Sequence, residues 1–281
     1  MTAHVFVAGP ASWNTLVRLD RLPESRPHMV RATGHDTAIG GTSAGKALHL
    51  ALLGERVTLR TLVGTDDLAD KILRRLDRDR IEVVAEIAPG ASEQHLNLMT
   101  PTGERLSIYL DVPELVHEQH AERTREALRG CDVAVIDLAE HSRPLLAEAR
   151  PLGVEVWCDL HDYNGRSVFH QEFIDSADVL FLNDDGLGDP LPFMTERVRA
   201  GAAIVVCTQG AAGALAMTAD GTLHVPAPPV DDIVDTNGAG DAFLSGFLSS
   251  RLRGRDLADC LKAGHAQAAT ALRAPDLAPE S

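Results

Sequence analysis

Aromatic residues are scarce in this chain of 281 residues: Phe, Trp and Tyr make up 4% of it, with two Trp and two Tyr. Few rings are therefore available to stack on nucleobases. Basic residues are also few: the chain has 26 Lys and Arg against 41 Asp and Glu, which gives a formal net charge of −15. Such a chain is a poor partner for nucleic acid, because phosphate backbones reward basic patches. We interpret the acidity as a contribution to solubility.

The four cysteines are widely separated and form no CxxC pair: Cys131, Cys158, Cys207 and Cys260. Most stand in or beside apolar segments, so we expect buried free thiols in a reducing compartment. No apolar run approaches the length of a membrane span, and no targeting signal is visible. The composition predicts a soluble cytoplasmic protein with neither membrane nor nucleic acid as a partner.

Short apolar segments alternate with helical patterns along most of the chain. The predicted strands cover residues 4–9, 57–64, 133–138, 154–160, 177–183 and 202–210. The predicted helices cover residues 43–54, 67–81, 143–153, 240–254 and 256–273, and a hairpin turn falls at Asp220-Gly221. Near-continuous apolar strands indicate an α/β fold with a central, mostly parallel sheet and helices on both faces. Such sheets bind ligands outside the carboxyl ends of their strands.

Two regions, 11–38 and 82–112, do not follow this alternation. Within 82–112, apolar residues recur at about every second position between Pro-Gly and Pro-Thr-Gly turns, as in antiparallel strands. We expect both regions to form a small β lid beside the main sheet, within a single domain of residues 1–281. Open strand edges invite pairing, so we expect a homodimer through the lid.

One segment that could bind phosphate is GGTSAGK at residues 40–46. It approaches the phosphate-loop pattern that ends in Lys and Ser or Thr, but Ala47 stands where the Mg²⁺-binding hydroxyl belongs. This alternative predicts an NTPase in which Lys46 binds the nucleotide.

A second such segment is VDTNGAGDAF at residues 234–243, where Gly238-Ala239-Gly240-Asp241 leads into an apolar helix. The first amides of a helix are unpaired, glycine lets an anion approach them, and the helix dipole favours negative charge. A carboxylate at this point could take a proton from an attacking hydroxyl, as phosphoryl transfer requires. Alternatively, Asp241 only stabilises the first helical turn.

VDTNGAGDAF closely resembles the C-terminal signature of the PfkB, or ribokinase-like, carbohydrate kinases. Further segments resemble this family in the same order: IGG at 39–41, LVGTDDLADKILRRLDRDRIEV at 62–83, LFLND at 180–184, VVCTQGAAGAL at 205–215 and AGHAQAATAL at 263–272. The resemblance covers almost the whole chain. It implies a ribokinase-like fold and a kinase, dependent on ATP and Mg²⁺, that phosphorylates a hydroxyl of a sugar or related small polyol.

The resemblance also implies a set of site residues. Asp241 would be the catalytic base, and the anion hole would consist of the amides of Gly238, Ala239 and Gly240. The residues implied beside the nucleotide are Asn183, Thr208, Gly210, Gly213 and, at the adenine, His265. Those implied at the substrate are Asn14, Gly40, Gly41, Gly45, Lys46 and Asp241.

Three of these regions depart from the family pattern. Asn14 stands where an Asp is usual, Gly45 where a substrate-contacting Asn is usual, and Gly186 where a Glu is usual. The departures concern the substrate more than the reaction. Lys46 could meet an anionic substrate such as a sugar phosphate, or it could be a solvated lysine on the helix surface.

Ion sites follow from the same resemblance. Asp184 and Asp185 offer carboxylates near Mg²⁺ in place of the usual Glu. Asp235 could orient the anion-hole loop, and many relatives hold a monovalent cation in this region, so K⁺ is a further expectation.

After the strand 154–160, the His-Asp-Tyr segment 161–163 could bind substrate hydroxyls or form a hydrogen-bonded turn.

Two alternatives to a sugar kinase stay open. A nucleoside or sugar-phosphate kinase of the same family is one, although the shortage of aromatic rings disfavours a nucleoside. A sugar or nucleotide sensor with weak catalysis is the other. Positions 14, 45 and 186 favour the sensor, and the retained Asp241 opposes it.

Overall fold

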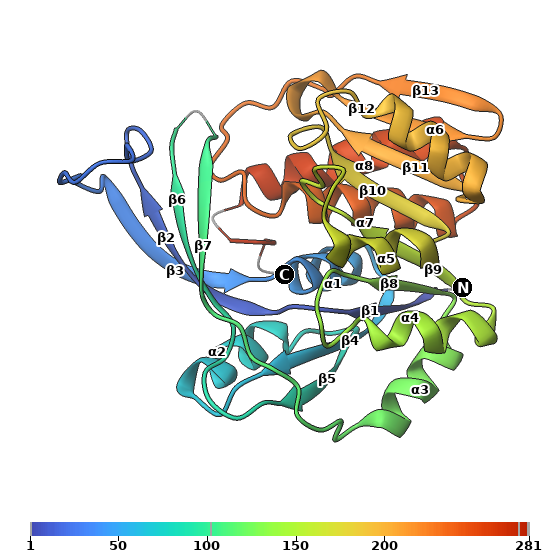
Figure 1. The fold of residues 1–281 in the computed structure, drawn as a ribbon, viewed down its shortest axis with the longest axis horizontal. Helices are drawn as coiled ribbons and strands as arrows, with labels where there is room; N and C mark the ends of the chain where they lie inside the picture. Colours follow the sequence, from blue (N-terminus) through green and yellow to red (C-terminus); the bar gives the residue numbers. More distant parts are fainter. Residues whose placement is uncertain (1, 102, 275, 280–281) are drawn as a thin grey trace.

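The computed structural model describes residues 2–101, 103–274 and 276–279, and its main unit is a nine-stranded sheet in the order β13-β12-β11-β10-β9-β8-β1-β4-β5 (Figure 1). The strands are β1 His4–Ala8, β4 Arg56–Val63, β5 Ile81–Ile87, β8 Val133–Ile136, β9 Glu155–Asp159, β10 Val179–Asn183, β11 Ile204–Thr208, β12 Ala214–Thr218 and β13 Gly221–Val225. The strands from β11 to β5 run parallel, and β12 and β13 are antiparallel. The predicted α/β fold is confirmed.

Helices cover both faces of this sheet. One apolar core lies under α1 Thr42–Leu52, α2 Asp67–Leu76, α7 Ala239–Leu252 and α8 Leu257–Leu272. The other lies under α3 Ala121–Arg129, α4 Pro144–Ala149, α5 Gln171–Ser176 and α6 Leu191–Ala200. Short 3₁₀ turns are η1 Arg150–Leu152, η2 Val168–His170 and η3 Gly210–Ala212. Alternate residues of a strand face opposite sides, so Val5 and Val7 enter the first core and Phe6 and Ala8 the second.

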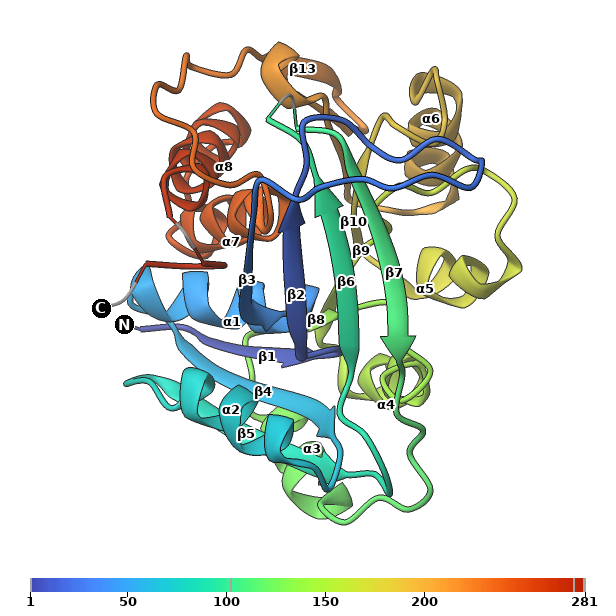
Figure 2. The same ribbon diagram turned by 90° about the vertical axis from the view of Figure 1, so that its left-hand side faces the viewer.

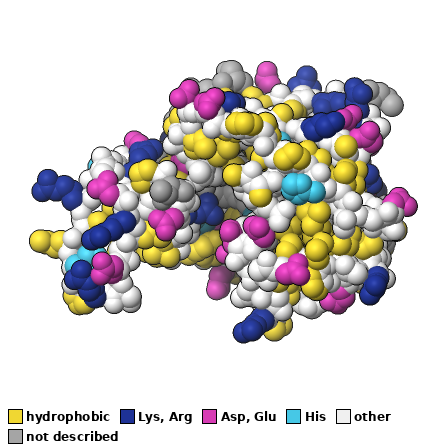
Figure 3. All heavy atoms as spheres, turned by 90° about the horizontal axis from the view of Figure 1, so that it is seen from above, with side chains coloured by type: hydrophobic (Ala, Val, Ile, Leu, Met, Phe, Trp, Pro, Cys, Tyr) yellow, Lys and Arg dark blue, Asp and Glu magenta, His cyan; other side chains and the backbone are white. Residues whose placement is uncertain are grey.

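A second, four-stranded sheet stands beside the main body in the order β3-β2-β6-β7. Its strands are β2 Ser12–Arg18, β3 Gly34–Gly40, β6 Gln94–Met99 and β7 Arg105–Asp111. Figure 2 shows these strands side by side in front of the main sheet. Viewed from above, the molecular surface is hollowed between this small sheet and the main body (Figure 3).

The sequence analysis misplaced several boundaries. Residues 82–88 were expected in the lid, but β5 is parallel to β4 at the edge of the main sheet. Ile81, Val83 and Ala85 stand at every second position and pack against the first core, so the strand has the alternation expected of an antiparallel strand. The helix expected over 67–81 ends at Leu76, and α3, α5 and α6 were not predicted. None of the helices in the described part of the chain is long and apolar enough to cross a membrane.

An aromatic ring of α7 packs against aromatic rings in the middle of the main sheet. The ring of Phe247 lies 5.3 Å from that of Phe181 on β10 and 5.9 Å from that of Trp157 on β9. Phe247 is fully buried, and Trp157 and Phe181 are nearly so. Aromatic pairs at such separations stabilise a core beyond the area they bury. The helix that carries Asp241 in its first turn is therefore held rigidly against the sheet.

We predict that Phe247→Ala lowers the free energy of unfolding by about 3–5 kcal/mol, because it removes a buried ring and leaves a cavity. Urea unfolding followed by circular dichroism measures the effect. Val168→Ala is the matched control, since that side chain is 86% exposed and its truncation should change stability by less than about 0.5 kcal/mol. Equal midpoints and slopes for the two variants would contradict the packing described here.

Candidate active site

Asp241 lies in the first turn of α7. The helix begins after Gly238, whose φ of 77° is left-handed, and no side chain caps it. The first amides of a helix have no partner within the helix, so the Gly238–Gly240 segment presents N–H donors next to the Asp241 carboxylate. The helix dipole adds partial positive charge at the same point.

The two oxygens of the Asp241 carboxylate have different surroundings. Oδ1 accepts a hydrogen bond from Thr42 Oγ1 and lies 3.2 Å from Lys46 Nζ. Oδ2 has no hydrogen-bond donor among the described residues. A Cβ atom added to Gly45 would lie 3.0 Å from Oδ2, so this oxygen lies close to the glycine and a side chain at position 45 would crowd it. The side chain is 12% exposed.

Burial raises the pKa of Asp241 above the ordinary carboxyl value, while the charges of Lys46 and His161 oppose that rise. The balance is reversed at Asp159: burial raises its pKa, but His161 and Lys46 outweigh burial and lower the pKa of Asp159 to about 2. Of these two carboxyls, Asp241 therefore has the higher affinity for a proton.

The Lys46 side chain is fully buried, and the sequence analysis did not anticipate this. Its ammonium lies among the carboxylates of Asp137 at 2.8 Å, Asp159 at 3.2 Å and Asp241 at 3.2 Å. Lys46 is thus neither a solvated surface lysine nor a group that an anionic substrate can reach. The phosphate-loop alternative is also wrong, because residues 40–46 leave a strand of the small sheet and the lysine faces carboxylates.

Asn14 lies close to the two glycines of the Gly-Gly signature. Asn14 is 3% exposed on β2, and its Oδ1 accepts a hydrogen bond of 2.8 Å from Ser12 Oγ. A Cβ atom on Gly40 would lie 2.0 Å from Asn14 Nδ2. Gly41 has a φ of 91° and packs against the carbonyl of Pro10. Close backbone approach, which only glycine allows, brings β2 and the start of α1 together.

The residues expected beside the nucleotide gather at the carboxyl ends of β10 and β11. Asn183 and Thr208 are partners in the parallel ladder. Gly210 and Gly213 bound η3, and both have positive φ. His265 is 8% exposed on α8, with Nε2 3.1 Å from the carbonyl oxygen of Val225. Their contact with a nucleotide stays a prediction.

The segment after Asn183 packs closely on the loop that follows β9. Asp185 donates its amide to Asn183 Oδ1 at 3.1 Å. A Cβ atom on Gly186 would lie 2.4 Å from the carbonyl oxygen of Asp162 and 2.5 Å from that of Tyr163. The usual family Glu cannot occupy position 186 in this arrangement. Among the described residues, no group of three or more His, Cys, Asp or Glu side chains is arranged to hold a metal ion.

Of residues 161–163, His161 lies at the site and Tyr163 lies in the core. His161 has a φ of 51°, donates its amide to Asp159 Oδ1 at 3.0 Å and is 37% exposed at the side chain. Tyr163 is 7% exposed, with its ring 5.4 Å from that of Phe193. The turn interpretation fits both contacts, and Tyr163 serves packing.

The loop before α7 is joined to the small sheet. Asp235 is buried, and its Oδ1 accepts a hydrogen bond of 2.8 Å from the amide of Asn237. Burial raises the pKa of Asp235. Arg105 of β7 donates to Asn237 Oδ1 at 3.3 Å. Asp235 thus holds the backbone of this loop at Asn237, while Arg105 of the small sheet contacts the same residue.

The sequence prediction did not include Thr42 and Ser43 on α1, and it did not place Asp137 or Asp159 beside Asp241. A usable signal existed, because each aspartate follows an apolar strand at the sheet edge where ligands bind.

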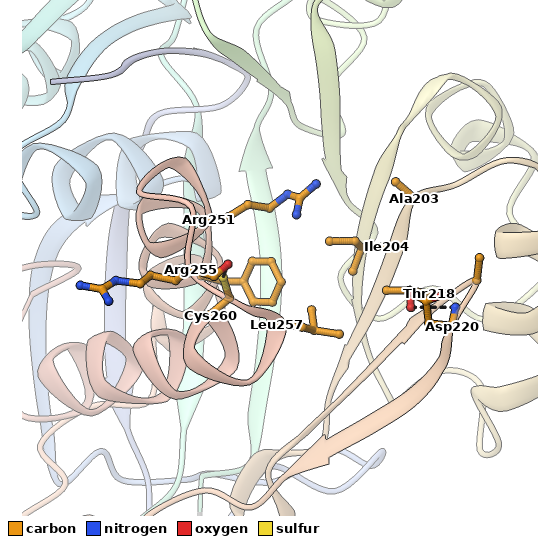
Figure 4. Close-up of a pocket in the computed structure, with 10 residues that line it drawn as sticks. Ala203, Ile204, Thr218, Asp220, Arg251, Arg255, Leu257 and Cys260 are labelled. Atoms are coloured by element: carbon orange, nitrogen blue, oxygen red, sulfur yellow. Dashed lines mark hydrogen bonds between the residues drawn. The ribbon is translucent and has the colours of Figure 1, made fainter. Parts of the chain in front are cut away.

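A cavity of about 270 Å³ lies elsewhere, at the opposite edge of the sheet (Figure 4). Ile204, Thr218 and Arg251 are among the residues that line it. Arg251 is in the last turn of α7, roughly 15 Å along the helix from Asp241 at 1.5 Å per residue. This cavity is separate from the candidate active site.

A carboxylate beside unpaired helix amides, at the ligand-binding edge of an α/β sheet, is typical of an enzyme of phosphoryl transfer. Comparison with known proteins gives the family: the pfkB family carbohydrate kinase model matches residues 10–279, and the chain belongs to this family. It is therefore a phosphotransferase whose acceptor is an alcohol group.

The relatives include kinases of different substrates. The acarbose 7(IV)-phosphotransferase of Actinoplanes sp. is 29% identical over 96% of this chain and 92% of its own. The ATP-dependent ribose-1-phosphate kinase of Halopiger xanaduensis is 30% identical over 93% of this chain and 89% of its own. The structure of a microbiome-derived acarbose kinase has a TM-score of 0.85 at 24% identity, over 98% of this chain and 94% of the other. This likeness supports the ribokinase-like fold.

We predict that Gly186→Ala lowers the free energy of unfolding by about 1–3 kcal/mol, because the added methyl group overlaps the backbone at Asp162 and Tyr163. Thermal and urea unfolding measure this loss. Gly34→Ala serves as the control, since a Cβ atom there has only Arg18 Nη1 near it, at 3.8 Å. A Gly186→Ala variant as stable as the control would show that the two loops are not in this close contact.

Proposed function

We propose that this protein transfers the γ-phosphoryl group of ATP to a hydroxyl of a sugar or related small polyol, with Asp241 as general base. The observation that carries the proposal is the asymmetry of the Asp241 carboxylate. Oδ1 is engaged by Thr42 and Lys46, whereas Oδ2 has no hydrogen-bond donor among the described residues and lies beside Gly45. An oxygen held in this way is suited to accept the proton of an incoming hydroxyl.

The residues present fit a nucleotide with its metal. The unpaired amides at Gly238–Gly240 suit phosphate oxygens, and Asn183 and Thr208 add polar groups at the same edge of the sheet. Mg²⁺ needs only one or two protein carboxylates when phosphates supply its other ligands, and Asp184 and Asp185 are the candidates. ATP with Mg²⁺, when bound, supplies the phosphoryl group and neutralises part of its charge.

The protein's own groups account for the rest of the reaction. Asp241 Oδ2 takes the proton as the substrate oxygen becomes a nucleophile. The amides of Ala239 and Gly240 donate hydrogen bonds to negative charge that develops on phosphate oxygens. The small sheet, joined to the α7 loop through Arg105 and Asn237, covers the site and excludes water, so that the phosphoryl group is not lost to hydrolysis.

The substrate class follows from the surroundings of the base. Buried Lys46 no longer favours an anionic sugar phosphate. Asn14 offers an uncharged amide, and Gly45 offers no side chain, so few fixed groups constrain the sugar ring. Relatives whose names refer to acarbose extend over nearly the whole chain. We therefore rank a neutral carbohydrate first, acarbose included, then a nucleoside, and a sugar phosphate last.

We predict that Asp241→Asn lowers kcat by ~10²–10⁴-fold, because the amide cannot accept the proton. The assay is ATP consumption with Mg²⁺, with and without K⁺, against acarbose, ribose, deoxyribose, cytidine and ribose 1-phosphate. Asp220→Asn is the matched control, since that aspartate is exposed in the β12–β13 turn.

The outcomes separate the candidate functions. Substrate-dependent turnover that collapses in Asp241→Asn and persists in Asp220→Asn supports the kinase and identifies its substrate. Full activity of Asp241→Asn would refute the base. Clear ligand binding with no ATP consumption for any compound would favour the sensor.

A further inference from the structure

Lys46 is a buried charge that the proposed reaction does not use directly. The chain has only three lysines, Lys46, Lys71 and Lys262, and Lys46 is fully buried. An ammonium deprived of water costs several kcal/mol unless it is paired and hydrogen-bonded. Its presence beside the proposed base therefore calls for a physical explanation.

Two aspartates hold Lys46 from the side of the sheet. Asp137, also fully buried, accepts from Lys46 Nζ at 2.8 Å with Oδ1 and from Ser43 Oγ at 2.6 Å with Oδ2. Asp159 Oδ2 lies 3.2 Å from the ammonium, and Oδ1 accepts the His161 amide at 3.0 Å. Both carboxylates are thus fixed by second contacts, so the ammonium between them has a defined position.

The third contact of the ammonium is with Asp241 Oδ1. The groups facing this carboxylate are Thr42 and Lys46 from α1, and Asp159 and His161 from β9 and its following loop. Asp137 lies beyond Lys46, on the β8 side. Three carboxylates surround the one ammonium, whose charge offsets the repulsion between Asp241 and Asp159, and His161 Nδ1 lies 3.6 Å from Asp159 Oδ2 on the same side.

We infer that Lys46 is a positioning residue for the base: it keeps the Asp241 carboxylate ionised and engages Oδ1, so that Oδ2 faces the substrate. This inference rests on the proposed role of Asp241. The adjacent residue Gly45 completes the arrangement, because a side chain at this position would crowd Oδ2, while Lys46 pairs with Oδ1.

The proton affinities agree with the geometry. Burial lowers the pKa of Lys46, but the three aspartates outweigh burial and raise it, so the side chain stays charged. Burial raises the pKa of Asp241, and Lys46 is the strongest opposing charge. Removing this ammonium should raise the pKa of Asp241 further. The ionised fraction of the base at a given acidic pH then falls.

The test replaces the nearest buried pair as a unit, in Lys46→Met with Asp137→Asn, because breaking only one partner would leave an uncompensated charge. Carboxyl ¹³C NMR, with the Asp241 signal assigned by its loss in Asp241→Asn, measures the pKa without any substrate. We expect a rise of about one to three pH units, the effect of an opposite charge within 4–6 Å. Lys262→Met, which removes an exposed lysine charge, should leave this pKa unchanged.

Enzyme kinetics give a second readout. In the double variant, the acidic limb of the pH profile of kcat should move to higher pH by the same amount as the pKa of Asp241. The KM for ATP should stay near that of the wild type. A purely structural role would lower kcat at every pH and leave the limb in place. An unchanged Asp241 pKa in a folded double variant overturns the inference.

A wild-type measurement covers the case in which the double variant does not fold. The chain has three lysines, so ¹⁵N spectra resolve the protected Lys46 ammonium. Its chemical shift should change with pH at the pKa of Asp241, and this transition should be absent in Asp241→Asn. A Lys46 signal with the same pH dependence in the wild type and in Asp241→Asn overturns the inference. Absent turnover, or full activity of Asp241→Asn, instead refutes the proposed function and is independent of these NMR results.

Discussion

The pairing of one buried ammonium with three carboxylates determines how the elements around the site fit together. Lys46 comes from α1, and its partners Asp137, Asp159 and Asp241 come from the ends of β8 and β9 and the start of α7. Because each uncompensated charge would cost several kcal/mol in the interior, few arrangements of these four elements satisfy all the charges. The position of the α7 amides, and of the small sheet that contacts their loop, depends on this junction.

Much of the fold was predictable from local patterns, and the failures have physical causes. The central strands are buried on both faces, so apolar runs such as 133–138 and 177–183 identified them. The edge strand β5 was assigned to the wrong sheet, because apolar residues stand at every second position from Ile81 to Ile87, and a parallel edge strand and an antiparallel strand can share this pattern. Helix α3 has a strongly polar sequence that buries little beyond Thr124 and Leu128, so its apolar periodicity was too weak to detect.

The site was predictable only where a backbone geometry requires particular residues. Glycines before an aspartate at a helix start indicated the anion-binding amides, and the structure has that left-handed turn at Gly238. Lys46 was misinterpreted because spacing along a helix indicates a face but not what that face meets. Its neighbours in space, Asp137 and Asp159, are more than ninety residues away in sequence, and pairing over that distance is a property of the tertiary structure.

The departures at positions 45 and 186 have one cause in common. In each case the glycine stands where another group approaches too closely for a side chain to fit easily: the Asp241 carboxylate at Gly45 and the backbone of Asp162 and Tyr163 at Gly186. Under the proposed mechanism, losing these side chains removes fixed hydrogen bonds around a substrate but leaves the proposed base and the helix amides in place. In this proposal, substrate choice and phosphoryl transfer depend on different residues, so one can change while the other is retained. The buried ammonium of Lys46 belongs with the second set, since every contact it makes is with a group of the protein and none requires a particular sugar.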